Sequence, residues 1–184
     1  AEELQRRLEA CDANTRILAP DEPIGQVYGY LHLSTLSVNG VDPVKPLFQA
    51  MREALDGGAE MLICGTALGG AFGRTAHSDD ELMKGGAAGL MKTVKKEFPE
   101  LHARVVDLDP HESPDVLAAQ LHAELTAADE LVEVGWHKGV RQLLKAIPAG
   151  PVDPSSDNSG IDSDSVVLIT GGARGITARV AITL

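Results

Sequence analysis

The stretch that decides the fold is residues 81–136, which read ELMKGGAAGLMKTVKKEFPELHARVVDLDPHESPDVLAAQLHAELTAADELVEVGW. Apolar residues recur at helical spacing over residues 81–97 and again over 114–126. Each of these segments is followed by a short apolar run typical of a buried strand, first Arg104–Leu108 and then Leu131–Trp136. The stretch therefore predicts helix, strand, helix and strand in turn.

The same alternation extends toward the amino terminus. The expected elements are a helix at residues 2–11, a brief strand at Arg16–Ala19, a loop at Asp21–Gly25, a strand at Gln26–Leu33, a helix at 43–56 and a strand at Met61–Cys64. Asp42 and Pro43 are residue types that open helices, and the Gly57-Gly58 pair ends this one. Residues 140–147 fit a strand or a helix, and we favour a strand.

Short apolar strands that alternate with amphipathic helices are typical of a parallel sheet covered by helices on both faces. We expect right-handed crossovers between the strands. The fold class is therefore α/β, with a Rossmann-like, doubly wound, mostly parallel sheet. We expect one such layer from about Arg16 to Ile147.

Charge and composition narrow the classes of partner. The chain has 184 residues, 16 Lys and Arg against 27 Asp and Glu, and only 3% aromatic residues. A net charge of −11 repels phosphate backbones and anionic lipid, so we expect neither nucleic acid nor a membrane as partner. Two cysteines, Cys11 and Cys64, suit a reducing compartment. Residues 1–16 lack the apolar core of a signal peptide, so we expect a cytoplasmic location.

A change of composition divides the chain. Residues 148–164, PAGPVDPSSDNSGIDSD, hold three prolines and little apolar surface, which predicts a linker. Residues 1–147 would be one α/β domain. Residues 165–184 would be the first strand, glycine turn and helix start of a second domain that has no room to finish before Leu184.

The strongest motif is Val166–Thr177, VVLITGGARGIT. An apolar run at Val166–Thr170 predicts a strand that leads into a glycine turn and a helix. Glycines let the backbone approach a pyrophosphate, and a helix N-terminus supplies N–H donors and a positive dipole. The candidate cofactor-binding residues are Thr170, Gly171, Gly172, Arg174, Gly175 and Ile176. The alternative is a tight strand–helix turn without a ligand.

This motif resembles the opening of a short-chain dehydrogenase/reductase, whose pattern is T-G-x-x-x-G-x-G. Thr177 stands where that family has its last glycine, so the close packing of helix on strand expected there is in question. Arg174 resembles the basic residue that selects the 2′-phosphate of NADPH. A solvated side chain at a turn is an equal alternative for Arg174.

The rest of the chain resembles the ketoreductases of polyketide synthases. The resemblance lies in Gly85–Pro99 (GGAAGLMKTVKKEFP), Leu101–Pro110 (LHARVVDLDP), Val134–Val140 (VGWHKGV) and Gly29–Leu33 (GYLHL), and is nearest to polyunsaturated-fatty-acid or iterative synthases. It implies a degenerate structural half that binds no cofactor, followed by the start of an NADPH-binding half. The implied partners are the rest of the catalytic subdomain, an acyl carrier protein carrying a β-ketoacyl group, and other synthase domains.

The resemblance also implies that the catalytic residues lie outside this chain. The family uses a Ser and a Tyr-x-x-x-Lys pair, in which the Tyr protonates the ketone oxygen. Here Tyr28 is followed at the fourth position by His32, and Tyr30 by Ser34. We therefore expect no catalytic residue here, an inactive fragment, and the pair downstream of Leu184. The rival functions are a cofactor-free Rossmann-like docking scaffold and a different short-chain reductase with an unrelated extension.

Other motifs are better explained structurally. Gly65–Gly73 (GTALGGAFG) imitates a phosphate loop but lacks its Gly-Lys-Ser/Thr ending. Gly160–Ser163 (GIDS) matches the modified serine motif of an acyl carrier protein, but a strand is expected almost at once after it. The six histidines have no metal-ligand spacing, so no metal site is expected. The acidic clusters Asp79–Glu81 and Asp107/Asp109, and the Lys92–Lys96 cluster, fit helix ends and turns.

Overall fold

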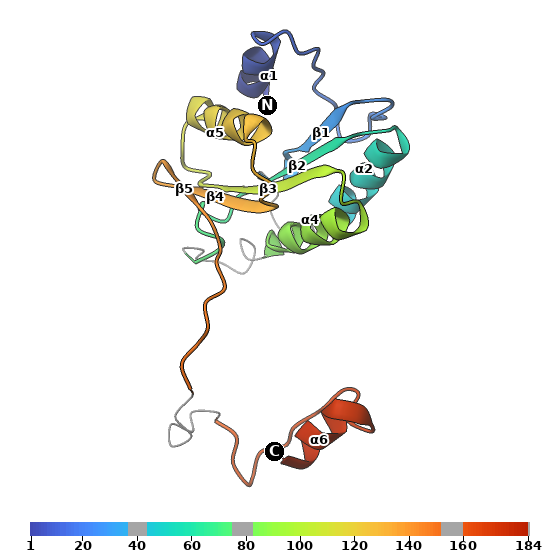
Figure 1. Ribbon diagram of the computed structural model, residues 1–184, viewed down its shortest axis with the longest axis vertical. Coiled ribbons are helices and arrows are strands. Elements are labelled where there is room, and N and C mark those ends of the chain that lie inside the picture. Colours follow the sequence, from blue (N-terminus) through green and yellow to red (C-terminus); the bar gives the residue numbers. More distant parts are fainter. Residues whose placement is uncertain (37–43, 75–82, 152–159, 184) are drawn as a thin grey trace. The chain divides into compact units, whose positions relative to one another are not determined.

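The computed structural model describes residues 1–36, 44–74, 83–151 and 160–183. The chain divides into two compact units, Ala1–Lys145 and Ala146–Leu184, which are described separately (Figure 1). Within the described ranges, no helix has both the length and the apolar character needed to cross a membrane.

The first unit is built on one five-stranded sheet. Its strands are β1 (Gly29–His32), β2 (Met61–Thr66), β3 (His102–Leu108), β4 (Glu133–His137) and β5 (Val140–Gln142). They lie side by side in chain order. The first four are parallel, and β5 returns antiparallel to β4. Strands β2 and β3 are buried almost throughout, as expected for central strands of a covered parallel sheet.

Helices cover both faces of this sheet (Figure 1). They are α1 (Glu2–Glu9), α2 (Val44–Asp56), α4 (Gly86–Glu97) and α5 (Pro114–Thr126), with a 3₁₀ turn, η1, at Ser34–Leu36. Apolar side chains of α2 and α4 pack with one face of β2 and β3, and those of α1 and α5 pack with the other. The predicted α/β, Rossmann-like fold class is confirmed.

The crossovers between the parallel strands do not share one hand. Each connection moves one strand in the same direction across the sheet. Helices α2 and α4 nevertheless lie on one face, and α5 lies on the other. The β3–α5–β4 crossover must therefore have the opposite hand to the β1–α2–β2 and β2–α4–β3 crossovers. The expectation that all crossovers are right-handed is wrong, because α5 packs on the face where Val106, Leu108 and Val134 form an apolar surface.

Local sequence explains the helix boundaries. Helix α5 begins and ends as predicted, because the Ser113 hydroxyl accepts the N–H of Val116 and Pro114 occupies the first turn. Helix α4 begins at Gly86 rather than at residue 81, and residues 81 and 82 lie outside the description. A Cβ on Gly86 would come within 2.5 Å of Val44 Cγ2, so this glycine permits the close approach of α2 and α4.

Helix α2 confirms most of the predicted helix at 43–56, while its expected cap, Asp42, and Pro43 are outside the part of the chain that is described. Near the amino terminus, α1 is two residues shorter than the predicted helix.

The strand predictions hold best in the centre of the sheet. Strands β2, β3 and β4 overlap the predicted runs and differ by one or two residues at their ends. The predicted strand at Gln26–Leu33 is reduced to β1. The predicted strand at Arg16–Ala19 is wrong, since that segment is a loop in which the Arg16 guanidinium donates to the carbonyls of Pro23 and Ile24. The strand favoured at residues 140–147 ends at Gln142 as β5.

In the second unit, residues 160–183 are described together with 146–151. The predicted strand at Val166–Thr170 is not formed, and this expectation is corrected. Val166 is 98% exposed and Leu168 94% exposed, because no described segment of this unit pairs with them. A strand needs a neighbour for its backbone groups. Helix α6 (Gly175–Thr183) does follow the glycine turn. The domain limits at 147 and 164 stay predictions.

Candidate functional site

The predicted cofactor residues lie together in one exposed turn at the start of α6. Gly171 and Gly175 have φ values of +72° and +70°, a backbone conformation that glycine adopts without strain. A Cβ at either position would meet nothing within 4 Å, so the turn is open around both. Thr170, Arg174 and Ile176 are exposed beside them. The turn thus presents backbone N–H groups and a helix N-terminus to solvent, which is the arrangement that binds phosphate.

The residue types at this turn fit a dinucleotide phosphate, but the neighbouring strands of a dinucleotide site are missing from the described part of the second unit. No ion pair to a described residue holds the Arg174 guanidinium, so it can turn toward an anion. Gly172 is half-buried, and a Cβ at this position would lie 3.2 Å from Ile169 Cγ2. A dinucleotide site also needs walls from neighbouring strands. The described residues of the second unit provide none.

The glycine-rich loop at Gly65–Gly73 in the first unit is closed, unlike the turn at the start of α6. It follows β2, and the side chain of Asp107 at the end of β3 fills it. The N–H of Leu68 donates to Asp107 Oδ1 at 2.7 Å, and the N–H of Phe72 donates to Oδ2 at 2.8 Å. The Thr66 hydroxyl donates to Oδ1 at 3.1 Å. Asp107 is only 2% exposed. The donors that a phosphate would use are therefore occupied by a carboxylate of the chain itself.

Close backbone contacts fix the same loop against the sheet. Gly70 has a φ of +70°, and a Cβ there would lie 1.8 Å from the carbonyl oxygen of Trp136. A Cβ on Gly135 in β4 would lie 2.4 Å from the Gly70 carbonyl oxygen. The His137 Nδ1 is 2.9 Å from the carbonyl oxygen of Gly69. The loop thus packs on β4 at distances that only glycine allows, and the structural interpretation of Gly65–Gly73 is supported.

The position of this loop explains why it resembles a ligand site. Ligands of open α/β sheets bind beyond the carboxyl ends of the strands, where neighbouring connections leave toward opposite faces. Here the connection after β2 leads to α4 on one face and the connection after β3 leads to α5 on the other. The crevice expected between β2 and β3 is the place that Asp107 and the loop fill. Burial raises the pKa of Asp107, and the loop hydrogen bonds act against that rise.

Two described histidines, His32 and His122, have side-chain partners in different parts of the first unit. His32 is 6% exposed, with Nδ1 at 3.0 Å from the Tyr30 hydroxyl and Nε2 at 2.7 Å from the Ser34 hydroxyl. Burial lowers the pKa of His32, so its ring is neutral at pH 7. His122 Nε2 lies 3.8 Å from Cys11 Sγ at the contact of α1 and α5. His77 is not among the described residues. Within the described ranges, no three potential ligands come together as a metal site.

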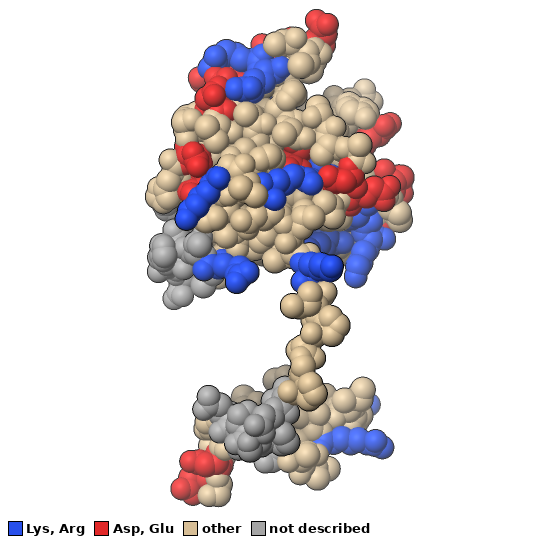
Figure 2. Space-filling view, turned by 60° about the vertical axis from the view of Figure 1, so that its left-hand side comes forward, with Lys and Arg blue, Asp and Glu red and all other residues tan. Residues whose placement is uncertain are grey.

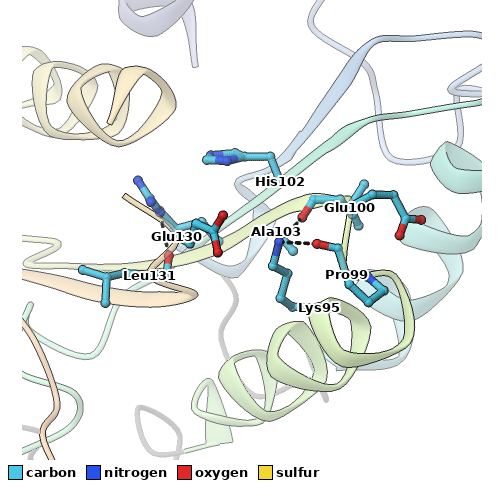
Figure 3. A pocket seen from close by; sticks show the side chains of 9 residues that line it. Lys95, Pro99, Glu100, His102, Ala103, Glu130 and Leu131 are labelled. Carbon is cyan, nitrogen blue, oxygen red and sulfur yellow. Dashed lines mark hydrogen bonds between the residues drawn. The ribbon is translucent and has the colours of Figure 1, made fainter. Parts of the chain in front are cut away.

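A pocket of about 250 Å³ lies at the amino-terminal end of β3 (Figure 3). It is lined by residues around Lys95 and His102. The Lys95 ammonium already donates to the carbonyls of Pro99 and Leu101, at 2.7 and 2.9 Å. Because the pocket lies at the opposite end of the strands from the β2–β3 crevice, it is separate from the edge where ligands of parallel sheets bind.

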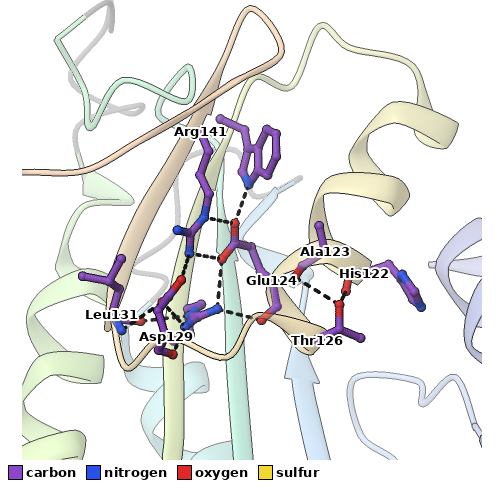
Figure 4. Close-up of polar contacts among 9 residues, drawn as sticks. His122, Ala123, Glu124, Thr126, Asp129, Leu131 and Arg141 are labelled. Atoms are coloured by element: carbon purple, nitrogen blue, oxygen red, sulfur yellow. Dashed lines mark hydrogen bonds and ion pairs between the residues drawn. The ribbon is translucent and has the colours of Figure 1, made fainter.

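Sequence reasoning missed a buried network of charges (Figure 4). Arg104 in β3 and Glu124 in α5 are 0% and 1% exposed in their side chains, with Arg104 Nη1 and Glu124 Oε2 3.0 Å apart. Asp129 and Arg141 complete the network, and Arg141 contacts both carboxylates at 2.7 and 2.9 Å. The sequence signal is Arg104, one of two charged residues in the run at 102–108, the other being Asp107. The four charges, two of each sign, are paired with one another.

Other candidate motifs have simple explanations. The Lys92–Lys96 cluster lies at the end of α4 as expected, but Lys92 is not simply solvated, since it pairs at 2.5 Å with Glu133 of β4. Asp162 accepts hydrogen bonds from the Asp164 N–H and the Ser165 hydroxyl in a turn, and no helix follows as a carrier-protein serine would require. The acidic cluster at residues 79–81 is outside the described ranges. Figure 2 shows Lys and Arg scattered over one face among acidic and uncharged residues.

Comparisons with known proteins add a family context. The chain is similar to segments of two synthases. It is 30% identical over 131 residues, 67% of this chain, to a polyunsaturated fatty acid synthase protein of Thraustochytrium sp. (strain ATCC 26185 / S-3). It is 31% identical over 115 residues, 60% of this chain, to polyketide synthase PksL of Bacillus subtilis (strain 168).

This chain spans only 5% and 2% of the length of these two relatives. No family model and no solved structure matches it. Both matched stretches are longer than the second unit, Ala146–Leu184, so the similarity extends well into the first unit. The resemblance to polyketide and polyunsaturated-fatty-acid synthases is therefore supported for the α/β layer itself.

Proposed function

We propose that this chain is part of the ketoreductase of a multidomain polyketide or fatty-acid synthase. The first unit is the structural half, and residues 165–183 begin the half that binds NADPH. The observation that carries the proposal is the open glycine turn at the head of α6, in a chain whose α/β layer is similar to synthase segments. When bound, NADPH supplies the hydride that reduces a β-ketoacyl thioester on an acyl carrier protein to the β-hydroxyacyl form.

Three residues of the turn have a defined part in this proposal. Gly171 and Gly175 hold the backbone in a conformation that leaves N–H groups facing the pyrophosphate. The N-terminus of α6 adds its positive dipole. Arg174 pairs with the 2′-phosphate, for which its planar guanidinium is suited. The proton that the product alcohol needs comes from a Tyr of the reductase outside residues 1–184, and the other synthase domains are its partners.

The closed loop of the first unit favours a second candidate, a scaffold that never binds a cofactor. Asp107 occupies the backbone donors of the loop in that unit, which supports a unit that binds no cofactor there. The third candidate, a different reductase with an unrelated extension, is disfavoured because the matched stretches reach into the first unit.

The first test is a fluorescence titration of NADPH into the 184-residue chain. We expect no micromolar binding and no reductase activity. A few hydrogen bonds at an exposed turn contribute about 1 kcal/mol each, and association costs about 4–15 kcal/mol of translational and rotational freedom. Micromolar binding to this chain alone would contradict the proposal and would point to the Gly65–Gly73 loop as the next place to examine.

The second test uses the native chain extended through its Tyr-x-x-x-Lys pair. That protein should bind NADPH and reduce a β-ketoacyl thioester, and Gly171→Val should abolish binding because valine does not adopt the φ of +72°. Gly150→Val is the matched control, since that glycine has open space around it and no positive φ. An extended chain with no such pair would support the scaffold instead.

A further inference from the structure

The loop between β2 and α4 binds an anion that belongs to the chain. Both carboxylate oxygens of Asp107 accept backbone N–H groups of the loop, one from Leu68 and one from Phe72. A hydroxyl donor, Thr66, adds a third bond. The three donors come from within seven residues of one another and converge on a side chain from a different strand. Loops hold free carboxylate or phosphate ligands in the same way. Here the anion is a side chain of the chain itself.

The backbone of the loop has the form of an anion-binding concavity. Gly69, Gly70, Phe72 and Gly73 have φ values of +80°, +70°, +59° and +77°. Turns that mix left-handed and right-handed residues direct successive N–H groups toward one point. Phe72 adopts this conformation without being a glycine, which has an energetic cost, and its N–H is one of the two that Asp107 accepts. The strained residue is therefore one of the two backbone donors to the anion.

Burial makes a negative charge on Asp107 costly. Asp107 is 2% exposed, and the removal of its carboxylate from water is unfavourable unless donors replace the water. In the β2–β3 register, Thr66 lies opposite Asp107, so the sheet places the hydroxyl and the carboxylate at the same level. The loop supplies the remaining donors.

We propose that residues 66–73 form an oxyanion-binding loop that the carboxylate of Asp107 holds closed, and that the loop takes up a free small oxyanion when this side chain is shortened. The ligand class is a carboxylate or phosphate group. This inference does not depend on the proposed reductase function. It explains why a glycine-rich loop at the carboxyl edge of the sheet is closed to external phosphate in the intact chain.

The test is chemical rescue of Asp107→Ala, which removes a group the size of formate. Thermal unfolding of the full chain is followed in sodium formate and in sodium chloride at equal ionic strength. We expect Asp107→Ala to unfold at a lower temperature in chloride, and 0.1 M formate to raise its midpoint by about 3 °C or more. The unsubstituted chain should show no difference between the two salts, because its loop is already filled.

Asp109→Ala is the matched control, since Asp109 accepts the N–H of His111 at an exposed turn two residues away. It should respond to formate no more than the unsubstituted chain. Inorganic phosphate is then tested in the same way, to ask whether the loop accepts the larger oxyanion. Equal formate responses in all three proteins, or no response in Asp107→Ala, would overturn the proposal.

A second variant covers the case in which Asp107→Ala does not fold. Asp107→Asn keeps the size of the side chain but offers only one acceptor oxygen. We expect the amide protons of Leu68 or Phe72 to exchange at least about tenfold faster than in the unsubstituted chain, with the amides of β3 unchanged. If neither loop amide changes its exchange rate, the carboxylate is not what holds the loop.

Discussion

At the scale of single residues, Glu124 joins three strands to α5. Its carboxylate accepts the indole N–H of Trp136 in β4 at 2.8 Å and pairs with Arg104 in β3 and Arg141 in β5. The Arg104 guanidinium, 0% exposed, also donates to the backbone carbonyls of Leu131 and Asp129. Each charge is therefore paired and hydrogen-bonded, which is the condition under which buried ions are tolerated.

Glu124→Gln should destabilise the first unit strongly. The neutral amide leaves the buried Arg104 paired only with the partly exposed Asp129, and loss of one partner of a buried ion pair costs about 3–5 kcal/mol. The measurement is the free energy of unfolding from urea denaturation. Glu130→Gln, at an exposed position six residues away, should change it by less than about 0.5 kcal/mol. Equal effects of the two variants would show that the network contributes little.

His32 should make the first unit less stable in acid. Burial lowers its pKa in the folded state below the ordinary value of 6.5. The unfolded chain then binds the proton more readily, so the free energy of unfolding falls as the pH is lowered through about 6.5. His102, whose pKa is also lowered by burial, contributes in the same direction.

The measurement is the stability difference between pH 7.5 and pH 5.5. We expect His32→Gln to lose less stability over this range than the unsubstituted chain, because it has no ring to protonate. His122→Gln, at the exposed contact with Cys11, should behave like the unsubstituted chain. If His32→Gln shows the same stability difference between the two pH values as the unsubstituted chain, other groups cause the acid sensitivity.

At the scale of elements, the sequence predicts best where local chemistry alone decides. Helix α5 was predictable to the residue, because Ser113 and Pro114 set its start. Buried strands β2 and β3 were predictable from their apolar runs. Val166–Thr170 has an equally apolar run but forms no strand, since a strand depends on a neighbour that its own sequence does not contain.

The closed loop at Gly65–Gly73 also depends on contacts that local sequence does not reveal. The missing Gly-Lys-Ser/Thr ending favours structure over ligand binding at Gly65–Gly73. The residue that fills the loop, Asp107, is about forty positions away and reaches it only through the pairing of β2 with β3. The hand of the β3–α5–β4 crossover was equally inaccessible, because it depends on which face α5 covers. Contacts between distant residues decide both features.

At the scale of the whole molecule, the two units differ in how much of their apolar surface they bury internally. The first contains two apolar clusters, one on each face of its sheet. In the second, every described apolar side chain is at least partly exposed, and α6 has no buried residue. Ile176 and Ile182 are 83% and 87% exposed. Apolar surface of this kind is what a further domain would cover, in agreement with the proposal that residues 165–183 begin a longer catalytic half.

This difference predicts where a protease will cut first. Residues 146–151 and 160–164 are exposed and have no helix or strand, and their composition cannot bury apolar surface. We expect the first cleavage by a low dose of a broad-specificity protease to fall between Lys145 and Asp164, as read by intact-mass spectrometry. The product that begins at Ala1 should then resist digestion, because its sheet and helices keep their partners. A first cut within Gly86–Glu97 would contradict the division, since α4 packs on the sheet through Ala87, Met91 and Val94.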